Sequence, residues 1–192
     1  GVPDLSDPPQ PPVITSTNRF GGIAGKPFAD FQIRTSGNPA PTDYGASPLP
    51  EGLSVNSGTG LISGTPAAES AGVYNVNLYA ENEFGARGTN RLTLTVLPAF
   101  TDAPPEGFPP PQVRLFLGQS TNIFFPISSN SLNTLLRYSS APNPPAGLLI
   151  NTNTGFISGI PTTLGTNRVT IRLAANGFTN SQAFDFIIQR DT

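Results

Sequence analysis

Side chains that could act as nucleophiles or bases are scarce in this sequence. Cys and His are absent, and Lys26 is the only lysine among 192 residues. A serine becomes a nucleophile only beside a base such as His or a lysine of lowered pKa. A Ser–Lys dyad or an internal isopeptide bond would therefore have to use Lys26, and an exposed strand lysine is the simpler interpretation. The sequence predicts no catalytic residue and no enzymatic activity.

Two carboxylates, Glu81 and Glu83, flank Asn82 and would point to one face at the end of a strand. Such pairs can hydrolyse glycosidic bonds at a suitable separation, and carboxylates are also ligands of calcium. Asp4 and Asp7 could converge with them if the chain enters the domain at the same end. Because no Asp-x-Asp motif accompanies these acids, we predict a solvated turn and no tight metal site, with weak calcium binding by the four acids left open.

A glycine-rich stretch occurs twice, as LPEGLSVNSGTGLISGTP over 49–66 and as PPAGLLINTNTGFISGIP over 144–161. The copies are 95 positions apart, and ten of their eighteen positions are identical. The stretch lacks the Lys-Ser/Thr end of a phosphate-binding loop, and Asn153 replaces Gly58 in the second copy. These differences exclude a P-loop and favour a structural device that two copies of one domain both need.

A tight hairpin explains the positions that are identical in the two copies of this stretch. Asn56 can accept hydrogen bonds from the backbone two residues on, and Gly60 can take a positive φ. Gly64 would allow a close approach or a bulge, and Pro66 would end the strand. We expect Gly155 to repeat the role of Gly60 in the second copy.

The segments around these residues alternate apolar and polar side chains, which is typical of half-buried strands. The clearest strand candidates are 73–81, 91–97, 167–175 and 183–189. Less regular candidates are 13–17, 26–35, 43–47 and 120–128. No segment has helical periodicity of useful length, so the predicted fold class is all-β.

The repeat divides the chain into predicted domains 1–98 and 99–192, with a Pro-rich boundary at about 98–112. About seven short strands in each half, separated by turn residues, match the pattern of an immunoglobulin-like sandwich. We therefore predict two tandem immunoglobulin-like antiparallel β-sandwiches. The first strand of the second domain cannot be placed within the Pro-rich segment from the pattern alone.

The stretch LPEGLSVNSGTGLISGTP, followed by AGVYNVNLYAEN, resembles the putative immunoglobulin-like family. That family is similar to the dystroglycan-type cadherin-like repeats of bacterial surface and secreted proteins. The second copy departs from the pattern at Pro144, Asn167 and 174–176. The resemblance implies cadherin-like sandwiches in an extracellular adhesion or spacer role. A calcium-binding adhesion repeat is one alternative, although Asp102 and Glu106 are the only acids near the domain junction.

The composition excludes several partners. Charged residues make up 11% of the chain and the net charge is −2, so no basic patch for nucleic acid is expected. No signal peptide or membrane-inserting segment is visible, and the Gly1 start suggests a fragment of a longer protein. The absence of Cys favours a bacterial surface or extracellular protein over a disulfide-bonded secreted domain.

These observations predict a non-catalytic extracellular adhesion or spacer module of a larger surface or secreted protein. Its partner would be a protein or glycan ligand at a cell surface, and no cofactor is expected. The alternative from another class is an accessory carbohydrate-binding module of a secreted glycoside hydrolase. Four Tyr and no Trp give little for sugar stacking, but Tyr79 is predicted on the outward face of its strand and could belong to an aromatic strip.

Overall fold

The computed structural model describes residues 9–105 and 107–192, and this part of the chain is almost entirely β-structure. Its one short 3-10 helix among the described residues is η1 (Asn133–Leu135). The chain divides into two compact units, Gly1–Val96 and Leu97–Thr192. No helix in the described ranges has the length and apolar character that crossing a membrane requires.

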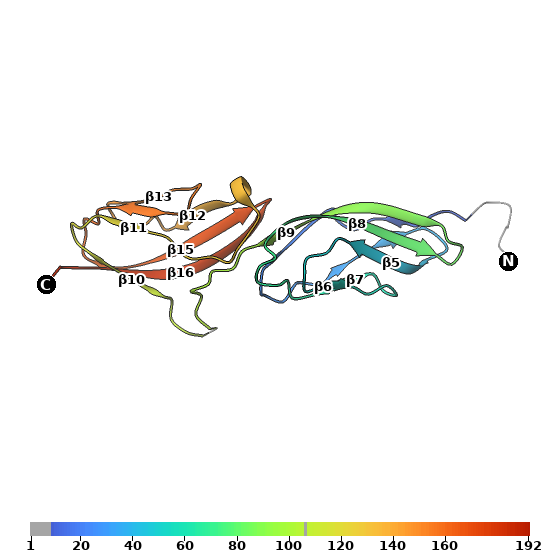
Figure 1. Ribbon diagram of the computed structural model, residues 1–192, viewed down its shortest axis with the longest axis horizontal. Coiled ribbons are helices and arrows are strands. Elements are labelled where there is room, and N and C mark those ends of the chain that lie inside the picture. Colours follow the sequence, from blue (N-terminus) through green and yellow to red (C-terminus); the bar gives the residue numbers. More distant parts are fainter. Residues whose placement is uncertain (1–8, 106) are drawn as a thin grey trace. The chain divides into compact units, whose positions relative to one another are not determined.

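The described part of the first unit contains nine strands, in two main sheets and a small pair (Figure 1). The four-stranded sheet has the order β2-β9-β8-β5, the three-stranded sheet the order β3-β7-β6, and β1 pairs with β4. The strands are β1 (Val13–Ile14), β2 (Arg19–Ile23), β3 (Phe31–Gln32), β4 (Thr35–Ser36), β5 (Pro41–Ser47), β6 (Leu53–Val55), β7 (Leu61–Gly64), β8 (Gly72–Asn82) and β9 (Arg87–Leu97).

The core of the first unit lies between these sheets because one face of each strand is apolar. On β8, Val76, Leu78 and Ala80 are buried, whereas Asn75 and Asn77 are exposed. This alternation confirms the strand predicted over 73–81. The β7 and β3 strands contribute apolar side chains to the same buried cluster. The polar face of β8 therefore points away from the core, and it is the face on which a binding site could lie.

The second unit repeats the two-sheet arrangement with seven strands. Its four-stranded sheet has the order β10-β16-β15-β12 and its three-stranded sheet the order β11-β14-β13 (Figure 1). The strands are β10 (Gln112–Phe116), β11 (Thr121–Ile123), β12 (Arg137–Ala141), β13 (Leu148–Ile150), β14 (Ile157–Gly159), β15 (Gly165–Ala175) and β16 (Phe178–Gln189).

One strand pair of the second unit differs from a purely antiparallel pattern. The first strand, β10, runs parallel to the last strand, β16, from Gln112 opposite Asp185 to Phe116 opposite Gln189. Parallel neighbours need a long connection, and here almost the whole domain separates the two strands. The core beneath them is aromatic, because the Phe184 ring lies 4.1 Å from the ring of Phe125, centroid to centroid.

Three predicted strands are shorter than the sequence suggested, and the one predicted over 13–17 is reduced to β1. The predicted strand 26–35 is divided into β3 and β4, which pair with different strands. Pro27 has no backbone N–H for a ladder, and it lies at the end that remains irregular. The predicted strand 120–128 is reduced to β11, and Pro126 interrupts its second half.

The repeated glycine-rich stretch forms a hairpin turn in each unit, as predicted. The Asn56 side-chain oxygen accepts hydrogen bonds from the backbone N–H groups of Gly58 and Thr59, at 3.0 and 3.1 Å. Gly60 has a φ of 73° and Gly155 a φ of 79°. These values confirm the positive φ predicted for both glycines.

A tyrosine ring covers the turn glycine in each unit, which the sequence did not reveal. A Cβ added at Gly60 would lie 2.7 Å from the Tyr44 ring, and one at Gly155 would lie 2.6 Å from the Tyr138 ring. Both tyrosines also donate a backbone hydrogen bond into the turn, to Ser57 in the first unit and Thr152 in the second. Glycine is thus required twice over, by its φ and by the ring above it.

Residues 1–98 are expected to fold when expressed alone, with one cooperative unfolding transition. The buried apolar cluster of the first unit is built entirely from residues between Ile14 and Val96, so the fragment keeps its own core. The measurement is a denaturant titration followed by circular dichroism and by the dispersion of amide NMR signals. A collapsed amide spectrum for the fragment, beside a dispersed one for the whole chain, would contradict this expectation.

Candidate functional site

The outward face of the first unit's four-stranded sheet carries the best candidate site. Tyr79 lies at its centre on β8, opposite Gly45 of β5 and Thr89 of β9. The neighbouring outward position toward the hairpin end pairs Glu81 with Arg87. Two residues further along β9, on the other side of Thr89, Arg91 lies opposite Asn77. The sheet thus places an aromatic ring between two arginines.

Tyr79 is held by contacts on several sides. Its ring lies over Gly45, where a Cβ would overlap the ring. Its hydroxyl donates a hydrogen bond to a carboxylate oxygen of Asp43 at 3.0 Å. The Arg87 guanidinium lies 4.0 Å from the ring centroid, a cation–π distance, and its Nε donates to Glu81 at 2.8 Å. The ring is therefore a fixed part of the sheet surface.

The hydrogen bond to the Asp43 carboxylate raises the pKa of Tyr79 above its usual 10.0, and desolvation acts in the same direction. A raised pKa means that this interaction stabilises the fold fully below pH 10 and is lost as the pH rises through the folded-state value. We expect Asp43→Ala to lower the pKa of Tyr79 toward its usual value. An NMR titration of the tyrosine ring carbons measures this shift.

Tyr74 is the internal control for that titration. Burial raises its pKa, and its hydroxyl donates to the backbone oxygen of Ser70 at 2.7 Å, away from Asp43. Its titration should therefore be the same in the parent and in Asp43→Ala. An unchanged Tyr79 titration in the variant would show that the carboxylate does not control this phenol.

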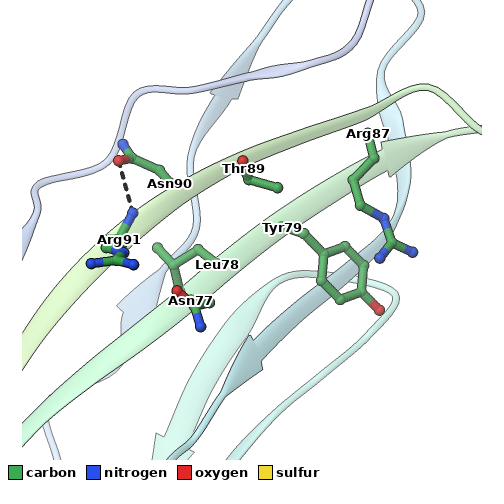
Figure 2. Close-up of a pocket in the computed structure, with 7 residues that line it drawn as sticks. All are labelled: Asn77, Leu78, Tyr79, Arg87, Thr89, Asn90 and Arg91. Atoms are coloured by element: carbon green, nitrogen blue, oxygen red, sulfur yellow. Dashed lines mark hydrogen bonds between the residues drawn. The ribbon is translucent and has the colours of Figure 1, made fainter.

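A shallow, open hollow of about 570 Å³ adjoins Tyr79 and is called the Tyr79 hollow below. Its lining is Asn77, Leu78, Tyr79, Arg87, Thr89, Asn90 and Arg91. Figure 2 shows Arg87 and Arg91 at opposite ends of the hollow, with Thr89 between them on β9 and Tyr79 beside them on β8. The lining combines two cations with amide and hydroxyl groups, and neither Asp43 nor Glu81 belongs to it.

The acids considered for calcium are distributed differently from the sequence hypothesis. Glu81 is paired with Arg87, and Glu83 is exposed in the hairpin turn. Asp4 and Asp7, like the junction residue Glu106, lie outside the described residues. Within residues 9–105 and 107–192, no three carboxylates gather where they could hold a metal ion.

The melting temperature of the chain is expected to be the same in millimolar calcium and in chelator. Calcium prefers six to eight oxygen ligands, and Glu81 already shares its carboxylate with Arg87 at 2.8 Å, which opposes a second cation there. Any specific ligand of the native state raises the melting temperature by mass action. A rise of several degrees with calcium, absent with magnesium, would show that a calcium site exists.

The second unit carries a different surface feature on its three-stranded sheet. Phe124 and Phe156 are 42% and 40% exposed, and their ring centroids lie 5.2 Å apart. They are the chain neighbours of the register pair Ile123 and Ile157. In the first unit the corresponding position next to Phe31 is Gln32, a polar residue. The sequence pattern did not single out this exposed pair.

The sequence correctly placed Tyr79 outward but missed both arginines of the hollow. The register between β8 and β9 could have revealed them, because it places Arg87 opposite Glu81. That register was hidden because β9 was predicted to begin at Arg91 and begins at Arg87. Gly88, which lies between, has no room for a Cβ because the Pro12 backbone oxygen passes over it.

Sequence comparison relates the chain to a bacterial adhesin. A "Serine-rich adhesin for platelets" of Staphylococcus aureus is 27% identical over 190 residues, which cover 94% of this chain and 8% of the adhesin. The protein of the same description from strain MRSA252 is 26% identical, over 94% of this chain and 13% of its own length. The chain therefore spans a small part of the relatives it matches.

The chain was also compared with solved structures and with family models, and the family model assigns the family. An endo-fucoidan hydrolase of glycoside hydrolase family 107 matches with 18% identity and a TM-score of 0.42, over 95% of this chain and 30% of the enzyme. Mouse cadherin-23 matches with 15% identity and a TM-score of 0.36, over 94% of this chain and 65% of that structure. The family model of the Putative Ig domain matches residues 11–97 and again residues 109–189, so the chain belongs to the Putative Ig domain family as two tandem repeats.

Proposed function

We propose that this chain is a non-catalytic adhesion or spacing module of a protein that acts outside the cell or on its surface. The observation that carries the proposal is the alignment of 94% of the chain with part of a staphylococcal adhesin. Both halves of the chain are Ig-like repeats, so the alignment covers complete folded units. The ligand is a protein or glycan presented at a cell surface.

The hydrogen bonding of the second unit supports a role in which the domain resists mechanical tension. Its first strand, β10, is parallel to its last strand, β16, across five residue pairs. Tension that pulls the start of β10 away from the end of β16 acts along the strands. All hydrogen bonds of the pair must then be sheared together, which resists force better than opening them one at a time. This geometry suits a module that holds other domains away from a surface.

Attachment of coated beads tests the adhesive part of the proposal. Beads carrying the 192-residue chain should attach to cultured cells or to spotted glycans in a dose-dependent manner, and soluble chain should compete. Background attachment on every surface, with high unfolding force in single-molecule pulling, would assign the spacing role alone. Release of products from glycan or peptide substrates by the purified chain would overturn the non-catalytic proposal.

The exposed pair Phe124 and Phe156 favours one second candidate, an accessory carbohydrate-binding module. Two adjacent rings can stack on the apolar faces of sugar units, whereas Tyr79 is covered by Arg87. Native gel electrophoresis in gels containing neutral polysaccharides would reveal such binding as retarded migration. Retardation that is lost in Phe156→Ser would support this candidate, and equal migration with and without polysaccharide would contradict it.

A further inference from the structure

The Tyr79 hollow presents donors that have no partner in the protein. Arg87 uses its Nε on Glu81, and no described residue accepts from its two terminal nitrogens. Across the described ranges, the Arg91 guanidinium likewise has no acceptor, since only its backbone N–H is bonded, to Asn90. Each guanidinium carries five N–H donors in a planar fork that matches a carboxylate. The hollow therefore offers free guanidinium donors from both arginines, and of the two only Arg91 lacks an ion-pair partner among the described residues.

The other lining groups indicate what else the ligand carries. Thr89 presents a hydroxyl between the arginines, and Asn77 presents an amide opposite Arg91 on the neighbouring strand. The aliphatic stems of the arginines and the Tyr79 ring edge can cover the C–H groups of a small ring. An acidic peptide would supply carboxylates to the arginines as well, but it carries no ring hydroxyls for the polar groups beside them. Carboxylate, hydroxyls and C–H groups together describe an acidic sugar.

We propose that the Tyr79 hollow binds a carboxylate-bearing sugar unit, of the uronic acid type, within an acidic glycan. The Arg91 fork receives the carboxylate, because this arginine has no competing acid beside it, and the terminal nitrogens of Arg87, whose charge is balanced by Glu81, add short-range donors. Thr89 and Asn77 bond the ring hydroxyls. This assignment rests on the proposed adhesive function and names the ligand class for it. Tyr79 acts as a positioning residue that holds Arg87 at the edge of the hollow.

The test is an NMR titration of the isotope-labelled 192-residue chain with tetragalacturonate. Amide signals of Asn77, Thr89 and Arg91 are expected to shift together and to saturate. Arg91→Gln should weaken binding by at least about tenfold, as expected for one charge-assisted contact. Raising the salt concentration should weaken binding to the parent, because the hollow is open to solvent.

Arg172→Gln is the matched control, since Arg172 is an exposed arginine on an outward strand position of the second unit. It removes the same charge and should leave the affinity unchanged. Neutral cellotetraose should bind at least about tenfold more weakly than tetragalacturonate, because it lacks the carboxylate. Equal affinity of Arg91→Gln and the parent, or equal affinity for the neutral sugar, would overturn the proposal, as would tighter binding of a hexaglutamate peptide.

The outcome separates this inference from the proposed adhesive function. If coated beads attach to cells and Arg91→Gln beads attach equally well, with no galacturonate binding in the titration, the adhesive function stands and the acidic-sugar site falls. If galacturonate binds at the Tyr79 hollow and the beads attach to nothing, the sugar site stands and adhesion falls. Both measurements use the same purified chain, so a difference in folding cannot explain a disagreement between their results.

Discussion

Replacing Gly64 by alanine is expected to lower the free energy of unfolding of the first unit by about 3 kcal/mol or more. Gly64 has a φ of 126°, a conformation that essentially only glycine adopts, and forcing another residue there costs about 1–3 kcal/mol. The added Cβ would also collide with the backbone oxygen of Gly52. Backbone cannot rotate away as a side chain can, so overpacking adds about 1–3 kcal/mol.

Gly58→Ala is the matched control in the same hairpin. A Cβ at Gly58 would meet only the Asn56 side-chain oxygen, at 3.5 Å, and its φ is not in the left-handed range. A compatible Gly→Ala change alters stability by less than about 1 kcal/mol in either direction. Denaturant titration of the full chain, followed through amide signals of the first unit, measures both variants. Equal midpoints for Gly64→Ala and Gly58→Ala would show that the close approach at Gly64 is not needed.

The fold could be predicted from the sequence where local pattern and tertiary structure agree. The alternation of Val76, Leu78 and Ala80 has period 2, and the buried face of β8 follows it directly. The repeated stretch was assigned to a turn because Asn56 and Gly60 have local reasons to be there, and those reasons act in the structure as well. Local chemistry of this kind needs no knowledge of what lies opposite in space.

The sequence did not predict strands that form because of their contacts with distant parts of the chain. β2 has the sequence RFGGI, whose two glycines weaken strand propensity, and it forms because it pairs along β9. The Gly22 position shows the cause, since a Cβ there would lie 2.8 Å from the Phe28 ring. Small residues that admit a neighbouring ring look like turn residues in the sequence. The same confusion hid the start of β9, where Gly88 admits the Pro12 backbone.

The candidate site was predictable only in part, for a related reason. Tyr79 was placed outward because the face of a strand follows from alternation along one segment. Its neighbours Arg87 and Gly45 follow from register between segments, which no single segment contains. The sequence predicted a solvated turn around Glu81 and gave no role to Asp43, because partners across a sheet are not visible in it. Their partners across the sheet turn Glu81 and Asp43 into supports of the Tyr79 surface.

Asn82 ties the start of the first unit to the β8–β9 hairpin, and its loss is expected to be nearly as damaging as that of Gly64. Asn82 is 2% exposed, and its side-chain nitrogen donates to the backbone oxygen of Gln10 at 3.0 Å. Its side-chain oxygen accepts from the backbone N–H groups of Phe84 and Ala86, at 3.1 and 3.2 Å. Asn82→Ala removes three contacts at once.

The expected cost of Asn82→Ala is about 2–4 kcal/mol, because each buried backbone group left without a partner costs about 1–3 kcal/mol and water can reach part of the turn. Asn75→Ala is the matched control: Asn75 lies on the same strand with an exposed side chain, so its loss should cost less than about 0.5 kcal/mol. The comparison is again by denaturant titration, and hydrogen exchange adds a local readout. The amides of Phe84 and Ala86 should exchange faster in Asn82→Ala and at the parent rate in Asn75→Ala. Unchanged exchange at both amides in Asn82→Ala would mean that the hairpin end does not depend on this side chain, and a loss of stability would then have to come from the Gln10 contact alone.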